Sequence, residues 1–161
     1  MEILDLYDDN FKYLNETIIR GTKPDSGKNI MLSIVFIKNS DNKYLIQKTS
    51  KEKGNMYAST GGHVKHNENA EDTIIRELEE ELSIKININE LKKIIIFKYP
   101  NRSCIFNVYL LEKDIDINKI KLQYEEVDKI EWMTISEIEN KIDSASFLES
   151  HAYIFNNYIK D

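Results

Sequence analysis

The sequence of 161 residues has few of the residues that cross-link or interrupt a chain: one cysteine, two prolines and five glycines. The single cysteine, Cys104, excludes an intramolecular disulfide, which fits a protein of a reducing compartment. No apolar run reaches the roughly 18 residues that a membrane span needs, and the N-terminus lacks a signal-peptide pattern. We therefore expect a cytoplasmic protein that does not associate with membranes.

An excess of basic residues is also missing. Lys and Arg number 22 against 28 Asp and Glu, and the net charge of -6 argues against a general nucleic-acid-binding protein. A small diphosphate or nucleotide remains a plausible partner, because a bound cation can supply positive charge locally. The composition, 41% hydrophobic and 31% charged, is ordinary for a globular protein, and we expect one domain over residues 1–161, as a monomer or a homodimer.

Carboxylates concentrate between Gly61 and Ile84. The pattern predicts a helix over about 69–82, capped by Asn67 or Asn69. An apolar stripe anchors one face of this helix: Ala70, Ile74, Leu78 and Leu82. Beside it, the acids spaced i, i+3 and i+4 share a face: Glu77, Glu80 and Glu81. Three converging carboxylates repel one another unless a cation joins them, and oxygen ligands suit Mg²⁺ or Mn²⁺.

The whole run reads G-x5-E-x7-R-E-U-x-E-E-x-S-U, where U is apolar. It resembles the Nudix box, G-x5-E-x7-R-E-U-x-E-E-x-G-U, at every fixed position but one. The matching residues are Gly62, Glu68, Arg76, Glu77, Leu78, Glu80, Glu81 and Ile84. Ser83 departs from the box, because the family has glycine there. A non-glycine residue in a left-handed helix ending costs up to about 1 kcal/mol, so the departure bears on the helix end rather than on the ligands.

The remaining pattern predicts mainly strands. Residues 2–20 form a predicted N-terminal β-hairpin, and residues 30–37 and 43–48 a second hairpin in the core sheet. A glycine turn at Gly61-Gly62 leads to the acidic helix. Further strands are expected at 91–99, 104–111 and 127–133, followed by helices at 134–142 and 144–159. The resemblance implies the same layout: an α+β fold, or α/β/α sandwich, with a mixed β-sheet between helices.

The resemblance also implies a chemistry. Glu77, Glu80 and Glu81 would hold Mg²⁺, with the carbonyl oxygen of Gly61 as a further ligand. The implied reaction is hydrolysis of a diphosphate linkage, in a substrate of the nucleoside diphosphate-X type, by metal-activated water. Glu80 or a loop acid would accept the proton of the water. For the loop acid we favour Glu126, with Glu125 as second choice, and a solvated loop carboxylate is the alternative for each.

Four further residues have expected roles beside the ligands. Arg76 and Glu68 fit an ion pair that orients the site. Lys51 and Lys53, in the polar loop 49–55, are candidates for binding substrate phosphates, although solvated loops also carry such lysines. His63 directly follows the two glycines and is a candidate ligand or phosphate contact.

Two other functions compete with hydrolysis. Segments over roughly residues 3–140 also resemble a Nudix subgroup close to isopentenyl-diphosphate isomerases. Those enzymes use a cysteine where this chain has Gly61-Gly62, and upstream histidines that it lacks, while Cys104 lies in an apolar run where we expect a buried thiol. A silent nucleotide-binding module is the second alternative, because a fold alone does not give activity.

Overall fold

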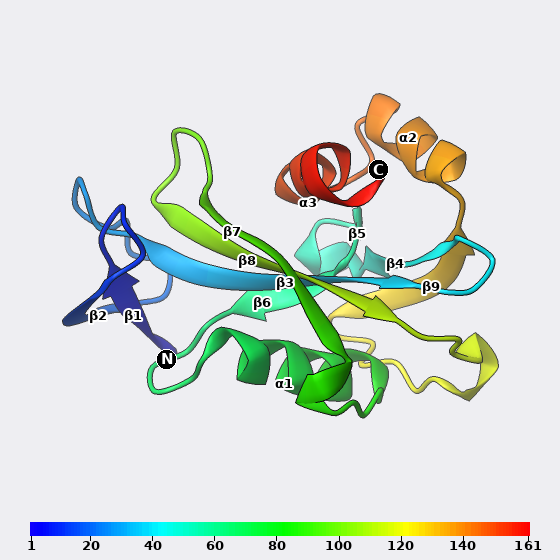
Figure 1. The fold of residues 1–161 in the computed structure, drawn as a ribbon, viewed down its shortest axis with the longest axis horizontal. Helices are drawn as coiled ribbons and strands as arrows, with labels where there is room; N and C mark the ends of the chain where they lie inside the picture. The colour runs from blue at the N-terminus through cyan, green and yellow to red at the C-terminus, as the bar shows by residue number, and fades with distance from the viewer.

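The computed structural model describes residues 1–161 and confirms the α+β sandwich. A seven-stranded mixed sheet lies between α1 on one face and α2 and α3 on the other (Figure 1). Its strands are β3 (Ile30–Lys38), β4 (Tyr44–Thr49), β5 (Tyr57–Ala58), β6 (Thr60–His63), β7 (Leu91–Lys98), β8 (Cys104–Glu112) and β9 (Val127–Met133). The helices are α1 (Ala70–Leu82), α2 (Ile135–Asp143) and α3 (Glu149–Ile154). None of these helices is long and apolar enough to cross a membrane.

The predicted N-terminal hairpin is present as a separate two-stranded sheet. β1 (Ile3–Tyr7) pairs antiparallel with β2 (Tyr13–Ile19). The hairpin lies at the end of the molecule where α1 begins (Figure 1). The backbone N–H of His66 donates to the carbonyl of Ile3 over 2.9 Å, and His66 Nδ1 lies 2.6 Å from the buried carboxylate of Asp5. These contacts fix the hairpin against the loop that precedes α1.

β3 and β4 form the predicted hairpin only next to the turn, where Lys38 pairs with Tyr44. Beyond that point β6 pairs antiparallel with β3, and β9 pairs antiparallel with β4. On its other side, β3 runs parallel to β8 along its whole length. The two strands therefore separate, and the gap between them admits the segment that leads into α1.

The prediction of a turn at Gly61-Gly62 is wrong. Both glycines lie in β6, opposite Ile34 and Ser33 of β3. A Cβ atom at Gly61 would collide with the carbonyl oxygen of Ser33. Glycine is therefore needed here for close approach of two backbones and of a helix, and not for a left-handed turn conformation.

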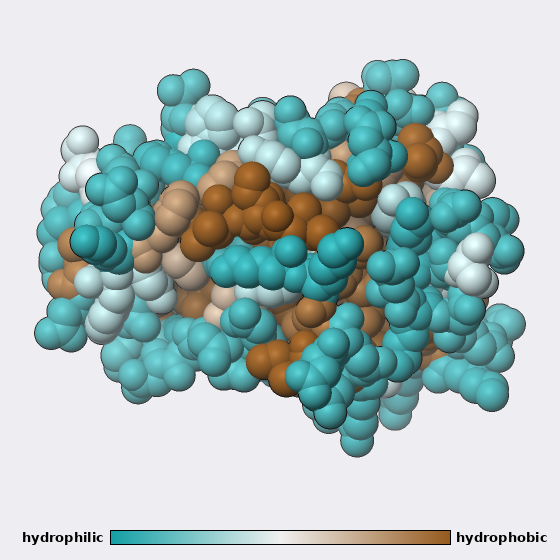
Figure 2. Space-filling model, in the orientation of Figure 1, coloured by the Kyte–Doolittle hydropathy of each residue, from teal (hydrophilic) through white to brown (hydrophobic).

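Strand β3 is buried on both faces, which explains its continuous apolar run. Ile34 and Phe36 pack with the cluster beneath α2 and α3, whereas Val35 and Ile37 pack with the cluster beneath α1. The edge strand β7 is less covered, since its isoleucines 94–96 are only half-buried. Figure 2 shows apolar surface bordered by polar side chains on the face of the molecule along which β7 runs.

Helix α1 begins and ends as capping chemistry requires. Asn69 is the N-cap, and its side chain accepts the N–H of Asp72 over 2.8 Å. Ser83 adopts the left-handed conformation expected of the family glycine, with φ 55° and ψ 31°. Its hydroxyl donates to the carbonyl of Lys121 over 3.0 Å, a contact that glycine cannot make. The substitution therefore leaves the helix ending intact.

The predicted helix at 144–159 begins later than expected, at Glu149. The preceding residues run beside β5 instead, where the N–H of Tyr57 donates to Ser146 and the N–H of Leu148 to Tyr57, each over 2.8 Å. These backbone hydrogen bonds compete with the helix. Leu148 is 38% exposed, whereas Phe147 and Phe155 are buried. The last turns, Phe155–Ile159, are π-helical.

Candidate active site

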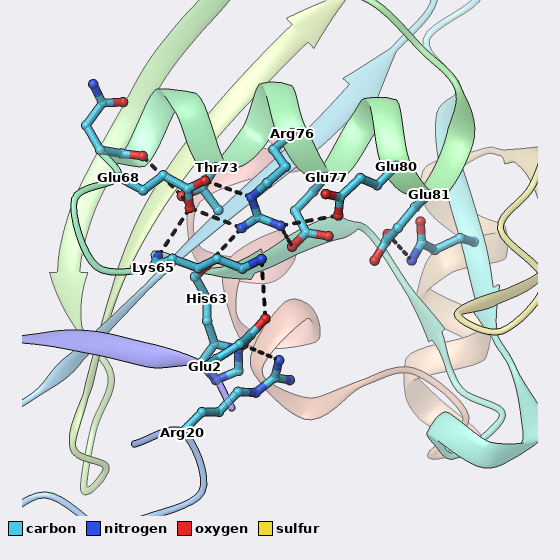
Figure 3. Close-up of polar contacts among 12 residues, drawn as sticks. Glu2, Arg20, His63, Lys65, Glu68, Thr73, Arg76, Glu77, Glu80 and Glu81 are labelled. Atoms are coloured by element: carbon cyan, nitrogen blue, oxygen red, sulfur yellow. Dashed lines mark hydrogen bonds and ion pairs between the residues drawn. The ribbon is translucent and has the colours of Figure 1, made fainter. Parts of the chain in front are cut away.

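Three carboxylates of α1, those of Glu77, Glu80 and Glu81, line one cavity of about 290 Å³ together with β6 (Figure 3). The predicted one-face arrangement of Glu77, Glu80 and Glu81 is therefore present. Other parts of the chain complete the wall with Glu2, Arg20, Leu32, Ile34, Lys53, Gly61, Gly62, His63, Lys65, Arg76, Gln123, Glu126 and His151. Almost all of these side chains are polar, so the cavity suits a charged ligand.

Arg76 organises the acidic row through a network of ion pairs. Its Nε and Nη2 donate to Glu68 over 2.7 and 3.0 Å, and its Nη1 lies 2.9 Å from Glu77 and 3.4 Å from Glu80. Nη2 also donates to the carbonyl of His63 over 3.2 Å. The hydrogen bond to Glu68 raises the pKa of Arg76 above its usual value, despite burial. The expected orienting pair of Arg76 and Glu68 thus ties the helix to β6.

Glu68 is fixed from a second side. Thr73 Oγ1 donates to it over 2.6 Å, and the N–H of Lys65 over 3.2 Å. Burial alone would raise the pKa of Glu68, but the hydrogen bonds from Arg76 and Thr73 hold it below its usual value. Glu68 therefore stays ionised and serves as the counter-ion of Arg76.

Glu77 and Glu81 have the opposite electrostatic character. Burial raises the pKa of both carboxyls, and the nearby charge of Glu77 helps to bring the pKa of Glu81 to about 8. Glu81 is only 8% exposed and accepts a hydrogen bond from Gln47 Nε2 over 3.3 Å. Thr60 Oγ1 donates to Gln47 Oε1 over 3.0 Å and so fixes the amide. The site therefore holds two close carboxylates that lack enough positive charge.

The donor set fits a hard divalent cation, although the side chains are not gathered into a ready-made set of three ligands. Glu77 and Glu80 turn toward Arg76, and Glu80 is half exposed. Carboxylate oxygens are the ligands that Mg²⁺ and Mn²⁺ prefer. The raised pKa of Glu81 reflects its burial and the repulsion from Glu77, and a cation at this place would offset both.

The four candidate site residues in loops, two lysines and two glutamates, divide into one pair inside the cavity and one pair outside it. Glu126 and Lys53 line the cavity and form an ion pair of 3.5 Å. Lys51 and Glu125 lie outside the cavity, in a surface depression beside Tyr124. Ser50 separates the pairs, since it donates through its N–H to the carbonyl of Glu126 over 3.0 Å and through its hydroxyl to that of Glu125 over 2.8 Å. The geometry therefore favours Glu126 and Lys53.

His63 lies in the cavity, as expected of a substrate-binding residue. Burial, with a contribution from the charge of Arg20, lowers its pKa to about 4, so its imidazole is neutral at pH 7. Cys104, at the start of β8, is half-buried with a pKa raised by burial, and it does not line the cavity. The lining also lacks the aromatic side chains that could stack a base.

Several lining residues were not predicted from the sequence. His151 comes from α3 and accepts the N–H of Ser59 over 3.2 Å, with the Ser59 hydroxyl 2.8 Å away. Gln123 precedes β9, and its N–H donates to the carbonyl of Glu81 over 2.9 Å. Glu2 and Arg20 come from the N-terminal hairpin. No spacing in the sequence links these residues to the acidic helix, because only the fold brings them together.

Comparison with known proteins identifies the family of this chain. The NUDIX domain model matches residues 30–152, and the chain belongs to that family. An uncharacterized Nudix hydrolase of Listeria monocytogenes is 29% identical over 163 residues, covering 99% of this chain and 94% of the relative. A similar protein of Listeria innocua is 28% identical over the same shares.

Solved structures show the same fold. The DR0079 protein of Deinococcus radiodurans superposes with a TM-score of 0.81 at 22% identity, covering 96% of this chain and 98% of its own. A bifunctional NMN adenylyltransferase/ADP ribose pyrophosphatase of Francisella tularensis, complexed with AMP and a manganese ion, gives a TM-score of 0.63 at 24% identity. That match covers 84% of this chain and 41% of the larger protein. The N-terminal hairpin lies outside residues 30–152, whereas the match to DR0079 covers 96% of this chain and so extends into the hairpin.

Proposed function

We propose that this protein is a divalent-metal-dependent hydrolase that cleaves a diphosphate linkage in a substrate of the nucleoside diphosphate-X type. The observation that carries the proposal is the convergence of Glu77, Glu80, Glu81 and Glu126 on one polar cavity. Membership of the NUDIX family and the pyrophosphatase named among its structural neighbours support the same reaction class. Mg²⁺ is the expected cofactor, and Mn²⁺ is a second candidate.

In the mechanism that we infer, Glu77, Glu80 and Glu81 would hold a divalent cation, with the carbonyl oxygen of Gly61 as a further candidate ligand. When bound, the cation supplies an acidified water and positive charge near the diphosphate oxygens. Arg76 keeps Glu77 and Glu80 on the cavity side of α1 through its contacts of 2.9 and 3.4 Å. Glu126 or Glu80 accepts the proton of the attacking water. Lys53, paired with Glu126, lies where a phosphate oxygen can approach.

The placement of Cys104 favours hydrolysis over isomerase chemistry. An isomerase of the related subgroup needs a thiol at the position of Gly61-Gly62, and the cavity lining has no cysteine. The buried and mutually repelling carboxyls of Glu77 and Glu81 argue against a silent binding module. Holding two such groups together lowers the stability of the fold, and a protein that binds no metal gains nothing in return.

The test is a substrate screen with Mg²⁺ in water enriched in ¹⁸O. Nucleoside di- and triphosphates, sugar nucleotides, dinucleoside polyphosphates and isoprenoid diphosphates are offered to the wild type and to Glu80→Gln. We expect ¹⁸O in a phosphate product and a loss of at least ~100-fold in turnover for the variant, because metal activation of water is lost. Solvent deuterium in isopentenyl diphosphate without ¹⁸O in phosphate would instead identify an isomerase.

A further inference from the structure

One end of the cavity is positively charged and comes from the N-terminal hairpin. Arg20, directly after β2, donates through Nη1 to Glu2 Oε2 over 2.8 Å. Lys65 Nζ lies 3.4 Å from the other oxygen of the same carboxylate. All three residues line the cavity with His63. Figure 3 shows Arg20, Glu2, His63 and Lys65 gathered on one side and the carboxylates of α1 on the other. The cluster therefore combines two cations with one anion.

The donors of this cluster are incompletely used. Arg20 makes a single side-chain hydrogen bond within the protein, so its Nε and Nη2 groups remain available. The imidazole nitrogens of His63 have no protein partner, and the only ion pair of Lys65 is with Glu2. Polar groups that face a cavity with unused donors are typical of a binding site for an anion.

The cluster is also held in place, as a binding site requires. Its β1 neighbour Asp5 lies 2.6 Å from His66, and Leu4 forms a β-bridge with Lys65. The N–H of Arg20 donates to the carbonyl of Glu2 over 3.0 Å, so backbone bonds as well as the ion pair align these two residues. His63 is tied to Arg76 through its carbonyl. The hairpin and the acidic row therefore keep a fixed relation to each other.

We propose that Arg20, with Lys65 and His63, forms an anion subsite that binds a phosphate group of the substrate at the hairpin end of the cavity. A guanidinium fork matches phosphate oxygens in a bidentate manner, and Lys65 adds a point charge. The identity of the anion as phosphate rests on the proposed hydrolase function. The hairpin precedes residues 30–152, so the family model does not contain Arg20.

The test measures binding of inorganic pyrophosphate by calorimetry in the presence of EDTA, so that neither metal nor turnover contributes. We expect Arg20→Gln to raise the Kd at least ~5-fold, because a charged hydrogen-bond donor is lost. Arg20→Lys restores part of the affinity. Lys28→Gln is the matched control: it removes the same charge and an ion pair of 2.6 Å with Glu16, but Lys28 does not line the cavity.

Glu2→Gln gives a result of opposite sign. It removes the anion that competes for Arg20 and Lys65, and pyrophosphate should bind more tightly. If Arg20 and Glu2 only stabilised the hairpin, both variants would weaken binding together, which would overturn the proposal. Equal effects of Arg20→Gln and Lys28→Gln would overturn it as well. Circular dichroism confirms that each variant is folded.

A kinetic readout follows once a substrate is known. Arg20→Gln should raise KM with little change in kcat, because the subsite binds the ground state and the transition state alike. A drop in kcat at constant KM would contradict the assignment. Since the pyrophosphate measurement needs no turnover, it decides on the subsite even if Glu80→Gln retains activity and the hydrolase proposal fails.

Discussion

The α-carbon of Gly62 lies directly against the carboxylate of Glu77, so that a Cβ atom there would overlap with Glu77 Oε1. At the neighbouring Gly61 a Cβ atom would instead collide with the backbone carbonyl of Ser33 and with Ile34 Cδ1, 2.5 Å away. Gly62 therefore leaves room for the side chain of Glu77, and Gly61 leaves room for the neighbouring strand β3.

This difference predicts two separable phenotypes. Gly62→Ala should displace Glu77 and lower turnover on the order of 100-fold, because a shift of about 1 Å in a catalytic group has that effect. The stability should change little, since the Glu77 side chain can rotate. Gly61→Ala should cost about 1–3 kcal/mol of unfolding free energy, because a backbone cannot move aside as a side chain can. Turnover and urea denaturation, measured on both variants, check the pair, and equal stability losses would contradict it.

Breaking the ion pair between Arg76 and Glu68 should lower the stability of the fold as well as the activity. Their side chains are only 20% and 15% exposed. Removing one partner leaves a poorly solvated charge, so Arg76→Met should destabilise the fold by about 3 kcal/mol. The double variant Arg76→Met with Glu68→Gln should recover part of that loss, since Glu68 is then no longer a poorly solvated charge without a partner. Denaturation of the single and double variants gives the coupling energy, and strict additivity would show that the pair has no structural importance.

Glu126 and its neighbour provide a matched test of the general base. Glu126→Gln should lower kcat with little change in KM, because a proton acceptor acts in the transition state. Glu125→Gln, one residue away and outside the cavity, should behave like the wild type. Rate measurements at saturating substrate compare the two. A loss confined to Glu125→Gln would exchange their assignments, and no loss in either would leave Glu80 as the base.

We expect the free energy of unfolding to fall at acidic pH because of the buried side chain of His151. Burial lowers its pKa in the folded protein to about 4, against an ordinary histidine pKa of 6.5. Between these values the unfolded chain binds more protons, so the free energy of unfolding falls as the pH is lowered. The contribution is fully present above pH 6.5 and is lost below it, by on the order of 3 kcal/mol at pH 4.

His151→Asn isolates this contribution, because asparagine offers an acceptor to Ser59 but does not titrate. Urea denaturation between pH 4 and pH 7.5 should show a smaller loss of stability for the variant than for the wild type. His66→Asn, which changes a more exposed histidine that does not line the cavity, serves as the control for replacing a histidine by asparagine. Parallel pH profiles for the wild type and His151→Asn would refute the prediction.

The sequence alone determined the features that depend on residues only a few positions apart in the chain. The spacing of Glu77, Glu80 and Glu81 puts them on one helix face wherever the helix lies, and Asn69 caps that helix through a contact three residues away. Apolar and β-branched runs predicted most of the strands, since each strand carries its own pattern. Even Ser83 was correctly placed at the left-handed end of the helix.

Only the tertiary structure decided which distant segments complete the cavity. Arg20 from the hairpin, Gln123 from the segment before β9 and His151 from α3 line one cavity because β3 and β4 separate and β6 lies between them. The same pairing placed Gly61 and Gly62 in a strand rather than a turn. Long-range strand pairing depends on which edges and apolar faces fit together over the whole sheet, and no window of sequence contains that information.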